Sequence, residues 1–150
     1  MKDTDLSIKL NTKAGEIVFP NPLLTASGTF SKEYMDLYGN DIPLGGIVLK
    51  THTYKTRKGN PGKRILEIPG GMMNSIGLQN PGIENINVEP FKNEGAPVII
   101  SVSILSEEEI PLFLKTVDER GIDIIELNLS CPNIMGKKIV TDLEEIEKLL

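Results

Sequence analysis

Apolar and polar residues alternate along the start of the chain, and this period of two predicts strands. "LSIKLN" (6–11) and "GEIVFP" (15–20) carry the alternation, and the turn-like "TKAG" separates them. Two strands joined by so short a turn pair antiparallel. The sequence therefore predicts a β-hairpin at its N-terminal end.

Four further runs are nearly continuous in apolar residues instead of alternating. They are "PLLTAS" (22–27), Gly46 to Lys50 in "GGIVLK", "PVIISVSI" (97–104) and "GIDIIELNLS" (121–130). Strands that are apolar on both faces are typical of a parallel sheet covered by helices. We therefore expect four buried, neighbouring strands.

Helices are predicted between these runs. We expect them from Ser31 to about Tyr38, within Gly82 to Asn93 with an interruption at "NVEP", over "SEEEIPLFLKTVDER" (106–120), and from "TDLEEIEKLL" (141–150) onward. In the third, Ser106 as N-cap and Glu109 three residues later form a capping box.

Residues 51–81 differ from the rest because they are rich in Gly and Pro and have little helical periodicity. Loops of this length in a compact domain are usually functional or disordered. Apolar residues threaded through the segment favour a functional loop, with Met72 and Met73 packing it down. His52 is expected to be a loop residue without an assigned role.

The order of elements, a hairpin and then strand and helix four times, is typical of an α/β fold. The doubly wound sheet and the (β/α)8 TIM barrel both fit. No G-x-G-x-x-G or Walker-type loop follows a strand, which weakens the nucleotide-binding doubly wound interpretation. A full barrel needs about 250 residues, and the chain has 150. We therefore expect residues 1–150 to be the N-terminal half of a single barrel domain, made of the hairpin and about four β/α units.

Composition narrows the class of protein. A net charge of −5 and a pI near 5.0 argue against nucleic acid as the partner. No apolar run approaches the ~20 residues that span a bilayer, and the polar N-terminus lacks a signal-peptide core. The single cysteine cannot form an intrachain disulfide, and no Cys/His cluster has the spacing of a metal site. A reducing, cytoplasmic setting without membrane contact is the expectation.

Polar residues gather where the predicted strands end, which is the active-site face of a β/α barrel. They are Ser27, Gly28 and Thr29, then Lys50 and Thr51, the loop from Asn74 to Asn80, Ser101 and Ser103, and finally Asn128, Cys131 and Asn133. Each has an ordinary explanation when taken singly; a lone cysteine, for example, is more often a small buried apolar residue than a catalyst. Together at one face they indicate an active site.

Four stretches together resemble the dihydroorotate dehydrogenases: "LLTASGTF", "GGIVLKT", "GNPGKRILEIPGGMMNSIGLQNPG" and "IELNLSCPN". The resemblance implies an FMN-dependent (β/α)8 barrel that oxidises dihydroorotate to orotate in pyrimidine biosynthesis. Cys131 is similar to the base of the cytosolic class. "NSIGLQNPG" looks closer to the NAD-linked heteromeric subfamily than to the fumarate-linked homodimers. In the former, the FMN catalytic subunit works with an electron-transfer subunit that carries FAD and a 2Fe–2S cluster. A homodimer of the catalytic subunit within a heterotetramer is then expected.

The resemblance also implies residue roles. Cys131 would remove the C5 proton of dihydroorotate while a hydride passes from C6 to FMN. Lys50 and Asn128 would contact both flavin and substrate, and Ser27 and Thr51 would line the flavin. Ser101 stands where the family usually has an asparagine facing FMN. The substrate would be bound by Asn74, Ser75, Ile76, Gly77, Leu78 and Asn133.

Two other interpretations stay open. The related dihydropyrimidine dehydrogenases share "NLSCP" but tend to have histidine at the position of Asn133, so a flavin enzyme acting on another dihydropyrimidine is one alternative. A non-catalytic half-barrel, either a fragment or an assembly partner, is the other. Because loops after strands 7–8 hold the phosphate in such barrels, we expect the 150 residues alone to bind FMN weakly and to be inactive.

Overall fold

The computed structural model describes residues 7–12, 15–38, 42–91, 95–106, 108–122 and 124–129. The chain forms two compact units that interleave along the sequence. Unit 1 comprises Met1–Lys50, Asn87–Ser101 and Ile122–Glu126, and unit 2 comprises Thr51–Ile86, Val102–Gly121 and Leu127–Leu150.

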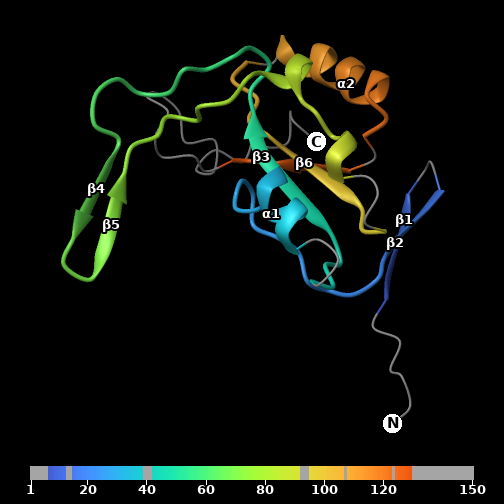
Figure 1. The fold of residues 1–150 in the computed structure, drawn as a ribbon. Helices are drawn as coiled ribbons and strands as arrows, with labels where there is room; N and C mark the ends of the chain where they lie inside the picture. Colours follow the sequence, from blue (N-terminus) through green and yellow to red (C-terminus); the bar gives the residue numbers. More distant parts are fainter. Residues whose placement is uncertain are drawn as a thin grey trace. The chain divides into compact units, whose positions relative to one another are not determined.

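The predicted N-terminal hairpin is confirmed. Strands β1 (Ile8–Thr12) and β2 (Gly15–Phe19) pair antiparallel, with Ile8 opposite Phe19 and Thr12 opposite Gly15 (Figure 1). The alternation of apolar and polar residues is therefore a reliable guide to this part of unit 1.

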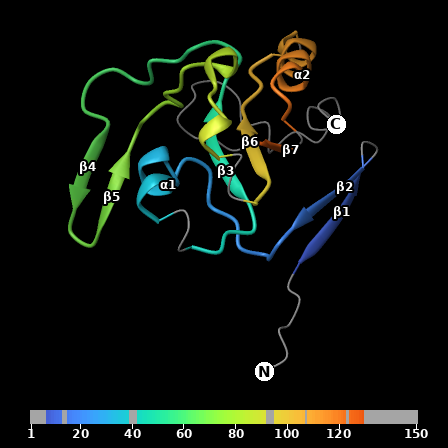
Figure 2. The same cartoon turned by 45° about the vertical axis from the view of Figure 1, so that its right-hand side comes forward.

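A three-stranded sheet follows, in the order β3 (Ile47–His52), β6 (Val98–Val102) and β7 (Ile124–Leu127) (Figure 2). The Ile47 N–H donates to the Pro97 carbonyl and the Ser103 N–H to the His52 carbonyl, so β3 and β6 run parallel. These three predicted strands are confirmed with changed bounds. As expected for a sheet covered on both faces, every residue of β3 except Lys50 is buried.

The strand predicted at 22–27 is only partly correct. Leu24 forms an isolated parallel bridge with Gly46, and no ladder extends from it. Side-chain hydroxyls bond to the β3 backbone beyond this bridge. Thr25 Oγ1 accepts from the Val48 N–H at 2.8 Å, and Ser27 Oγ donates to the Leu49 carbonyl at 3.0 Å. The segment thus follows β3 without becoming a regular strand. Its bridge and the three strands lie side by side in the order in which they occur along the chain.

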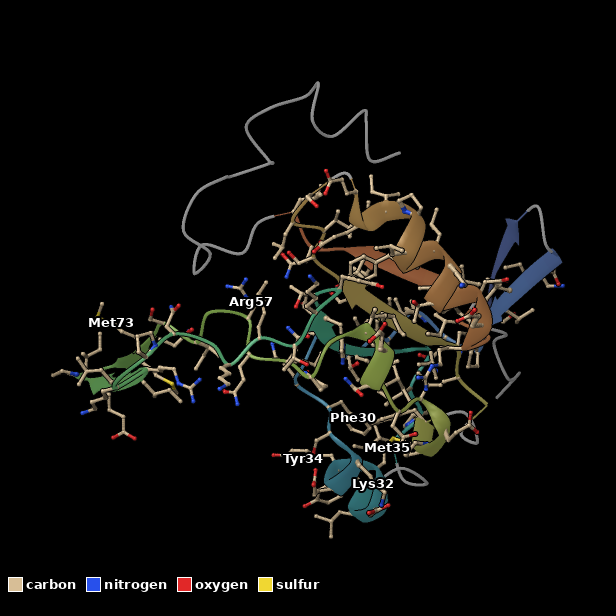
Figure 3. All side chains as sticks on the ribbon, turned by 90° about the horizontal axis from the view of Figure 1, so that it is seen from above. Phe30, Lys32, Tyr34, Met35, Arg57 and Met73 are labelled. Atoms are coloured by element: carbon tan, nitrogen blue, oxygen red, sulfur yellow. The ribbon has the colours of Figure 1, made fainter. Side chains whose placement is uncertain are left out.

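Helix α1 (Lys32–Tyr38) confirms the predicted helix and packs within unit 1 through Met35. The rings of Phe30, Tyr34 and Tyr38 stack in turn, each pair with centroids 6.1 Å apart; Phe30, Lys32, Tyr34 and Met35 are seen around the helix in Figure 3. The buried apolar side chains of unit 1 are Met35, Ile47, Val48, Leu49, Val88, Phe91, Ala96, Ile99 and Ile100.

In place of the α-helix predicted within 82–93, the described residues form two short 3-10 turns, η1 (Ile83–Asn85) and η2 (Glu89–Phe91). The prediction is wrong because a polar contact interrupts the backbone ladder: the Glu89 N–H, which an α-helix would bond to the Asn85 carbonyl, donates to Asn87 Oδ1 instead. Pro90 adds a residue without an N–H.

Helix α2 (Glu109–Glu119) begins later than the predicted capping box. Its N-cap is Glu108, without a side-chain cap, and the Glu109 carboxylate accepts from the Leu105 N–H at 3.0 Å instead of from Ser106. Phe113 of α2 meets Tyr54 edge-on, with centroids 5.8 Å apart, and Arg120 donates to the carbonyls of Ile86 and Glu84. These contacts hold α2 against η1 within unit 2. No helix among the described residues has both the length and the apolar character that a membrane span requires.

The long segment 51–81 contains a second hairpin that the sequence did not predict. Strands β4 (Ile65–Ile68) and β5 (Gly71–Asn74) pair antiparallel around Pro69 and Gly70 (left in Figure 1). All its side chains are exposed, so the expectation that Met72 and Met73 pack the loop is wrong: they are 63% and 60% exposed.

Candidate functional site

The predicted site residues are divided between the two units. Unit 1 contains Ser27, Lys50 and Ser101, and unit 2 contains Thr51, Asn74–Leu78 and Asn128. Lys50 was expected as the last residue of its strand and Thr51 just after it, but both lie inside β3. His52, expected in a loop, is the buried last residue of that strand. Cys131 and Asn133 lie outside the described residues.

Lys50 is the exposed residue of β3, and its side chain runs closely past Gly28. A Cβ on Gly28 would lie 2.8 Å from Lys50 Cδ, and Gly28 has a φ of +73°, which favours glycine. Gly28 is therefore needed both for the turn after Ser27 and for the course of the lysine. The result is a lysine side chain that passes a turn of small residues. Its ammonium group is of the kind that stabilises an anionic or electron-rich ligand.

The two serines of unit 1 have different surroundings. Ser27 is half-buried, and its hydroxyl donates to the Leu49 carbonyl at 3.0 Å. Ser101 lies in the middle of β6 with no exposed surface. Their roles as cofactor contacts stay predictions.

In unit 2 the structure brings two predicted residues together at the end of β3. Asn128 Nδ2 donates to Thr51 Oγ1 at 3.1 Å, although the two residues are 77 positions apart. The Asn128 N–H also donates to the Val102 carbonyl at 2.8 Å. The residue after β7 is thus tied by its main chain to β6 and by its side chain to β3.

The predicted substrate loop is held on one side by residues that precede the β4–β5 hairpin. The Ser75 N–H donates to the Arg64 carbonyl at 2.8 Å, and the Asn60 N–H donates to the Ile76 carbonyl at 3.0 Å. Asn60 Nδ2 reaches both the carbonyl and the hydroxyl of Ser75, at 3.2 and 2.9 Å. The start of the loop is therefore built by pairing with a second loop.

Two successive residues with positive φ then turn the chain. Gly77 has a φ of +75° and Leu78 a φ of +53°, and Leu78 is the one non-glycine residue with this conformation in the part of the chain that the structure describes. A Cβ on Gly77 would lie 2.5 Å from Asn60 Oδ1 and 2.7 Å from the Asn60 nitrogen. Only glycine fits there, which explains the Gly in "NSIGLQN" in physical terms.

Asn80 ends the loop that was predicted to lie at the active-site face, but no contact with cofactor or substrate was predicted for it. Its side chain is buried, donates to the Leu78 carbonyl at 2.7 Å and to Thr53 Oγ1 at 2.9 Å, and accepts from the N–H groups of Thr53 and Gly82. The "NPG" that begins with Asn80 was a turn signal in the sequence. It gave no sign that the asparagine side chain faces inward.

These contacts connect three segments of unit 2. Thr51 lies in β3 and Thr53 directly follows the strand; Thr51 accepts from Asn128, and Thr53 accepts from Asn80. Residues predicted from motifs far apart in the sequence therefore converge on one strand end. The groups presented are hydroxyls and amides, which both donate and accept hydrogen bonds.

Residues 9–150 match the family model described as dihydroorotate dehydrogenase. The chain belongs to the dihydroorotate dehydrogenase family. It is 41% identical over 136 residues to a protein of Thermoanaerobacter pseudethanolicus named dihydroorotate dehydrogenase B (NAD(+)), catalytic subunit, covering 85% of this chain and 43% of that protein. A protein of the same name from Endomicrobium trichonymphae is 44% identical over 148 residues, covering 93% of this chain and 46% of that one.

The fold of this dihydroorotate dehydrogenase family member is similar to a solved structure, the crystal structure of DHODH in complex with ferulenol from Eimeria tenella. The TM-score is 0.62 and the sequence identity 23%, over 99% of this chain and 45% of that chain. At this identity the likeness concerns the fold alone. The chain spans less than half the length of the curated relatives that it matches.

Proposed function

We propose that the protein containing this chain is the catalytic subunit of an NAD-linked dihydroorotate dehydrogenase and oxidises dihydroorotate to orotate in pyrimidine biosynthesis. The observation that supports this most is the meeting of Asn128 with Thr51 at the end of β3, where Asn80 also bonds to Thr53. Motifs that the family resemblance assigns to flavin and substrate are thereby joined within unit 2.

The polar groups present fit FMN as the cofactor. A flavin ring offers carbonyl and ring-nitrogen acceptors and an N–H donor, which suit hydroxyls, amides and one ammonium group. The lack of a Cβ at Gly28 lets the Lys50 side chain pass beside it, since an added Cβ would lie 2.8 Å from Lys50 Cδ. The family resemblance assigns to the cofactor Ser27, Lys50 and Ser101 of unit 1 and Thr51 and Asn128 of unit 2. When bound, FMN supplies the acceptor for the hydride that leaves C6 of the substrate.

The substrate would be oriented by the loop Asn74–Leu78 together with Asn128 and Asn133. Amide side chains and turn N–H groups complement the alternating donors and acceptors of a dihydropyrimidine ring and its carboxylate. Cys131 would take the C5 proton as a thiolate. A free thiol has a pKa near ~8.5, so a nearby cation or hydrogen-bond donor is needed to favour the thiolate.

The architecture that we propose for the whole domain is a (β/α)8 barrel. The segment at Leu24, then β3, β6 and β7, are neighbours in chain order. A doubly wound sheet reverses its strand order at a switch point, whereas a barrel does not. The described strands thus follow the barrel's order.

Electrons would pass from the catalytic subunit to NAD through a partner subunit that carries FAD and a 2Fe–2S cluster. The names of the curated relatives, NAD(+)-linked catalytic subunits, support a heteromeric complex. A homodimer of catalytic subunits at its centre and a cytoplasmic location remain part of the proposal.

The test is anaerobic stopped-flow absorbance of the complete flavoprotein as its gene encodes it. Dihydroorotate should bleach the flavin within single turnovers, whereas dihydrouracil, which lacks the carboxylate, should leave it oxidised on the same timescale. Reduction by dihydrouracil alone would mean that the substrate is another dihydropyrimidine and not dihydroorotate. Reduction by neither would remove the proposal.

The base is tested separately with Cys131→Ser. A serine hydroxyl is a far weaker base than a thiolate, so flavin reduction at neutral pH should fall by about 100-fold or more and recover in part as the pH rises. Orotate binding to the oxidised enzyme should persist, because the substitution is close in size. An unchanged reduction rate would show that another group removes the proton.

A further inference from the structure

We propose that Asn80 and Thr53 form a positioning pair that sets the conformation of the loop Asn74–Leu78. The importance of that loop for dihydroorotate rests on the proposed function; the pair itself rests on contacts within unit 2. Asn80 follows the loop by two residues, and Thr53 follows β3 directly.

The Asn80 side chain uses its full hydrogen-bonding capacity. An amide has two donors and two acceptor lone pairs. Nδ2 donates to the Leu78 carbonyl and to Thr53 Oγ1 at 2.7 and 2.9 Å, and Oδ1 accepts from the N–H groups of Thr53 and Gly82 at 3.1 and 2.9 Å. The residue is 4% exposed, so water does not replace a lost partner.

Thr53 completes the network from the other side. It is 1% exposed, and its hydroxyl donates to the Lys55 carbonyl at 2.6 Å while accepting from Asn80. Its carbonyl accepts from the Ile83 N–H at 3.0 Å. The pair thus joins the end of β3 to both ends of the turn that follows the loop.

This network acts on the loop through Leu78. A leucine at a φ of +53° is strained, and such a conformation persists only where its surroundings impose it. The bond from Asn80 Nδ2 to the Leu78 carbonyl and the burial of the leucine side chain are the restraints that the structure supplies. Without the donor, Leu78 is expected to relax to a negative φ and to redirect the loop before it.

The beginning of the loop has independent restraints. Asn60 and the Arg64 carbonyl bond to Ser75 and Ile76, and Arg57 Nε donates to the Gly77 carbonyl at 3.4 Å. Loss of the Asn80 donor should therefore alter the loop at Leu78 without detaching it. Asn80 is a positioning residue in this account, because it acts through Leu78 and not by touching the substrate.

Three variants of the complete FMN-containing protein test the pair. Asn80→Asp keeps the shape and an acceptor but loses the Nδ2 donor, Thr53→Val keeps the shape but loses the hydroxyl, and Thr53→Ser keeps the hydroxyl as the matched control. Each is measured for orotate affinity by the change in flavin absorbance, for amide exchange in peptides covering 74–82 and 98–102, and for FMN content.

Asn80→Asp should raise the orotate Kd by about 10-fold, the equivalent of about 1.4 kcal/mol. It should also speed exchange across 74–82, with exchange in β6 and FMN content unchanged. Thr53→Val should act in the same direction and more weakly, and Thr53→Ser should stay near the wild type. If Asn80→Asp does not fold, the orotate Kd and the exchange across 74–82 are compared between Thr53→Val and Thr53→Ser. Equal values for these two variants would overturn the pair.

A Kd for Asn80→Asp within about twofold of the wild type would overturn the pair, as would a loss of affinity that only follows a loss of FMN. If the wild type does not bind orotate, the proposed function fails. The exchange data then still judge the pair: unchanged exchange across 74–82 in Asn80→Asp would overturn it, and selective acceleration there would support it.

Discussion

Unit 2 contains two neighbouring segments that are held in opposite ways. The loop Ser75–Gly82 has no regular ladder of its own, yet Leu78 and Asn80 are only 5% and 4% exposed. The Leu78 carbonyl and the Gly82 N–H are both hydrogen-bonded to the Asn80 side chain. The β4–β5 hairpin has a regular antiparallel ladder, yet all its side chains are exposed. In Figure 3 Met73 lies on this hairpin, away from Arg57 of the segment that leads to it.

Regular secondary structure therefore does not determine how firmly a segment is held. A two-stranded hairpin without cover is marginally stable. An irregular loop can be rigid where buried side chains satisfy its backbone groups. A site that must hold its ligand in one geometry needs the second kind of segment, and Ser75 to Leu78 of the proposed substrate residues lie there, whereas Asn74 is the last residue of β5.

The largest expected effect comes from paired glycine substitutions. Gly77 and Gly62 have nearly the same φ, +75° and +76°, but a Cβ on Gly77 meets Asn60 at 2.5 Å whereas one on Gly62 meets nothing within 4 Å. Gly62→Ala should cost about 1 kcal/mol from strain alone, and Gly77→Ala about 1–3 kcal/mol more from overpacking. Urea unfolding measures both; equal costs would contradict the close packing of the loop.

A second pair compares the loop's end with the hairpin turn. Gly82 (φ +85°) leaves only 2.8 Å between an added Cβ and the Thr56 nitrogen, whereas Gly70 (φ +78°) has open space. Gly82→Ala should destabilise by about 1–2 kcal/mol more than Gly70→Ala, because its Cβ would meet the Thr56 backbone whereas a Cβ on Gly70 meets nothing within 4 Å. The free energies of unfolding of the two variants test this, and a larger loss of stability for Gly70→Ala would contradict the close packing at Gly82.

A smaller effect is expected where the loop meets residues before the hairpin. Asn60→Asp keeps the shape but removes the donor to the Ser75 carbonyl and hydroxyl, so about 1 kcal/mol of stability should be lost. Ser75→Ala removes one acceptor only and should cost less. If both variants unfold like the wild type, Asn60 does not hold the loop.

The smallest effect is expected on the hairpin. Met72→Thr and Met73→Thr replace side chains that are 63% and 60% exposed, so the free energy of unfolding should change by less than about 0.5 kcal/mol. Orotate affinity should be unchanged. A large loss of stability, or a smaller assembly in sedimentation, would show that something covers these methionines in the complete protein.

Much of the fold could be predicted because burial has a signature in the sequence. The apolar runs of β3, β6 and β7 and the alternation in β1 and β2 follow directly from which faces are covered. β4 and β5 were missed because an exposed hairpin has no such pattern, and Pro69-Gly70 was its one local signal. The helix expected within 82–93 failed for the opposite reason, because side-chain contacts outweighed helical propensity.

The site was predictable where motifs carried it and not where contacts over long sequence separations did. Thr51 and Asn128 were named as cofactor residues, and the structure joins them across 77 positions. Asn80 was missed because its partner Thr53 is 27 positions away, and nothing in either local pattern links them. A buried polar network is a property of the folded chain, so only the structure reveals it.

Amide hydrogen exchange of the complete flavoprotein, with and without saturating orotate, measures most directly whether the loop and Asn74 at the end of β5 bind a dihydropyrimidine carboxylate while the rest of the hairpin does not. Exchange in peptides covering 74–80 should be slower when orotate is present, and exchange in peptides covering 65–71 should be unchanged. Unchanged exchange over 74–80, or equal slowing over both segments, would contradict this expectation.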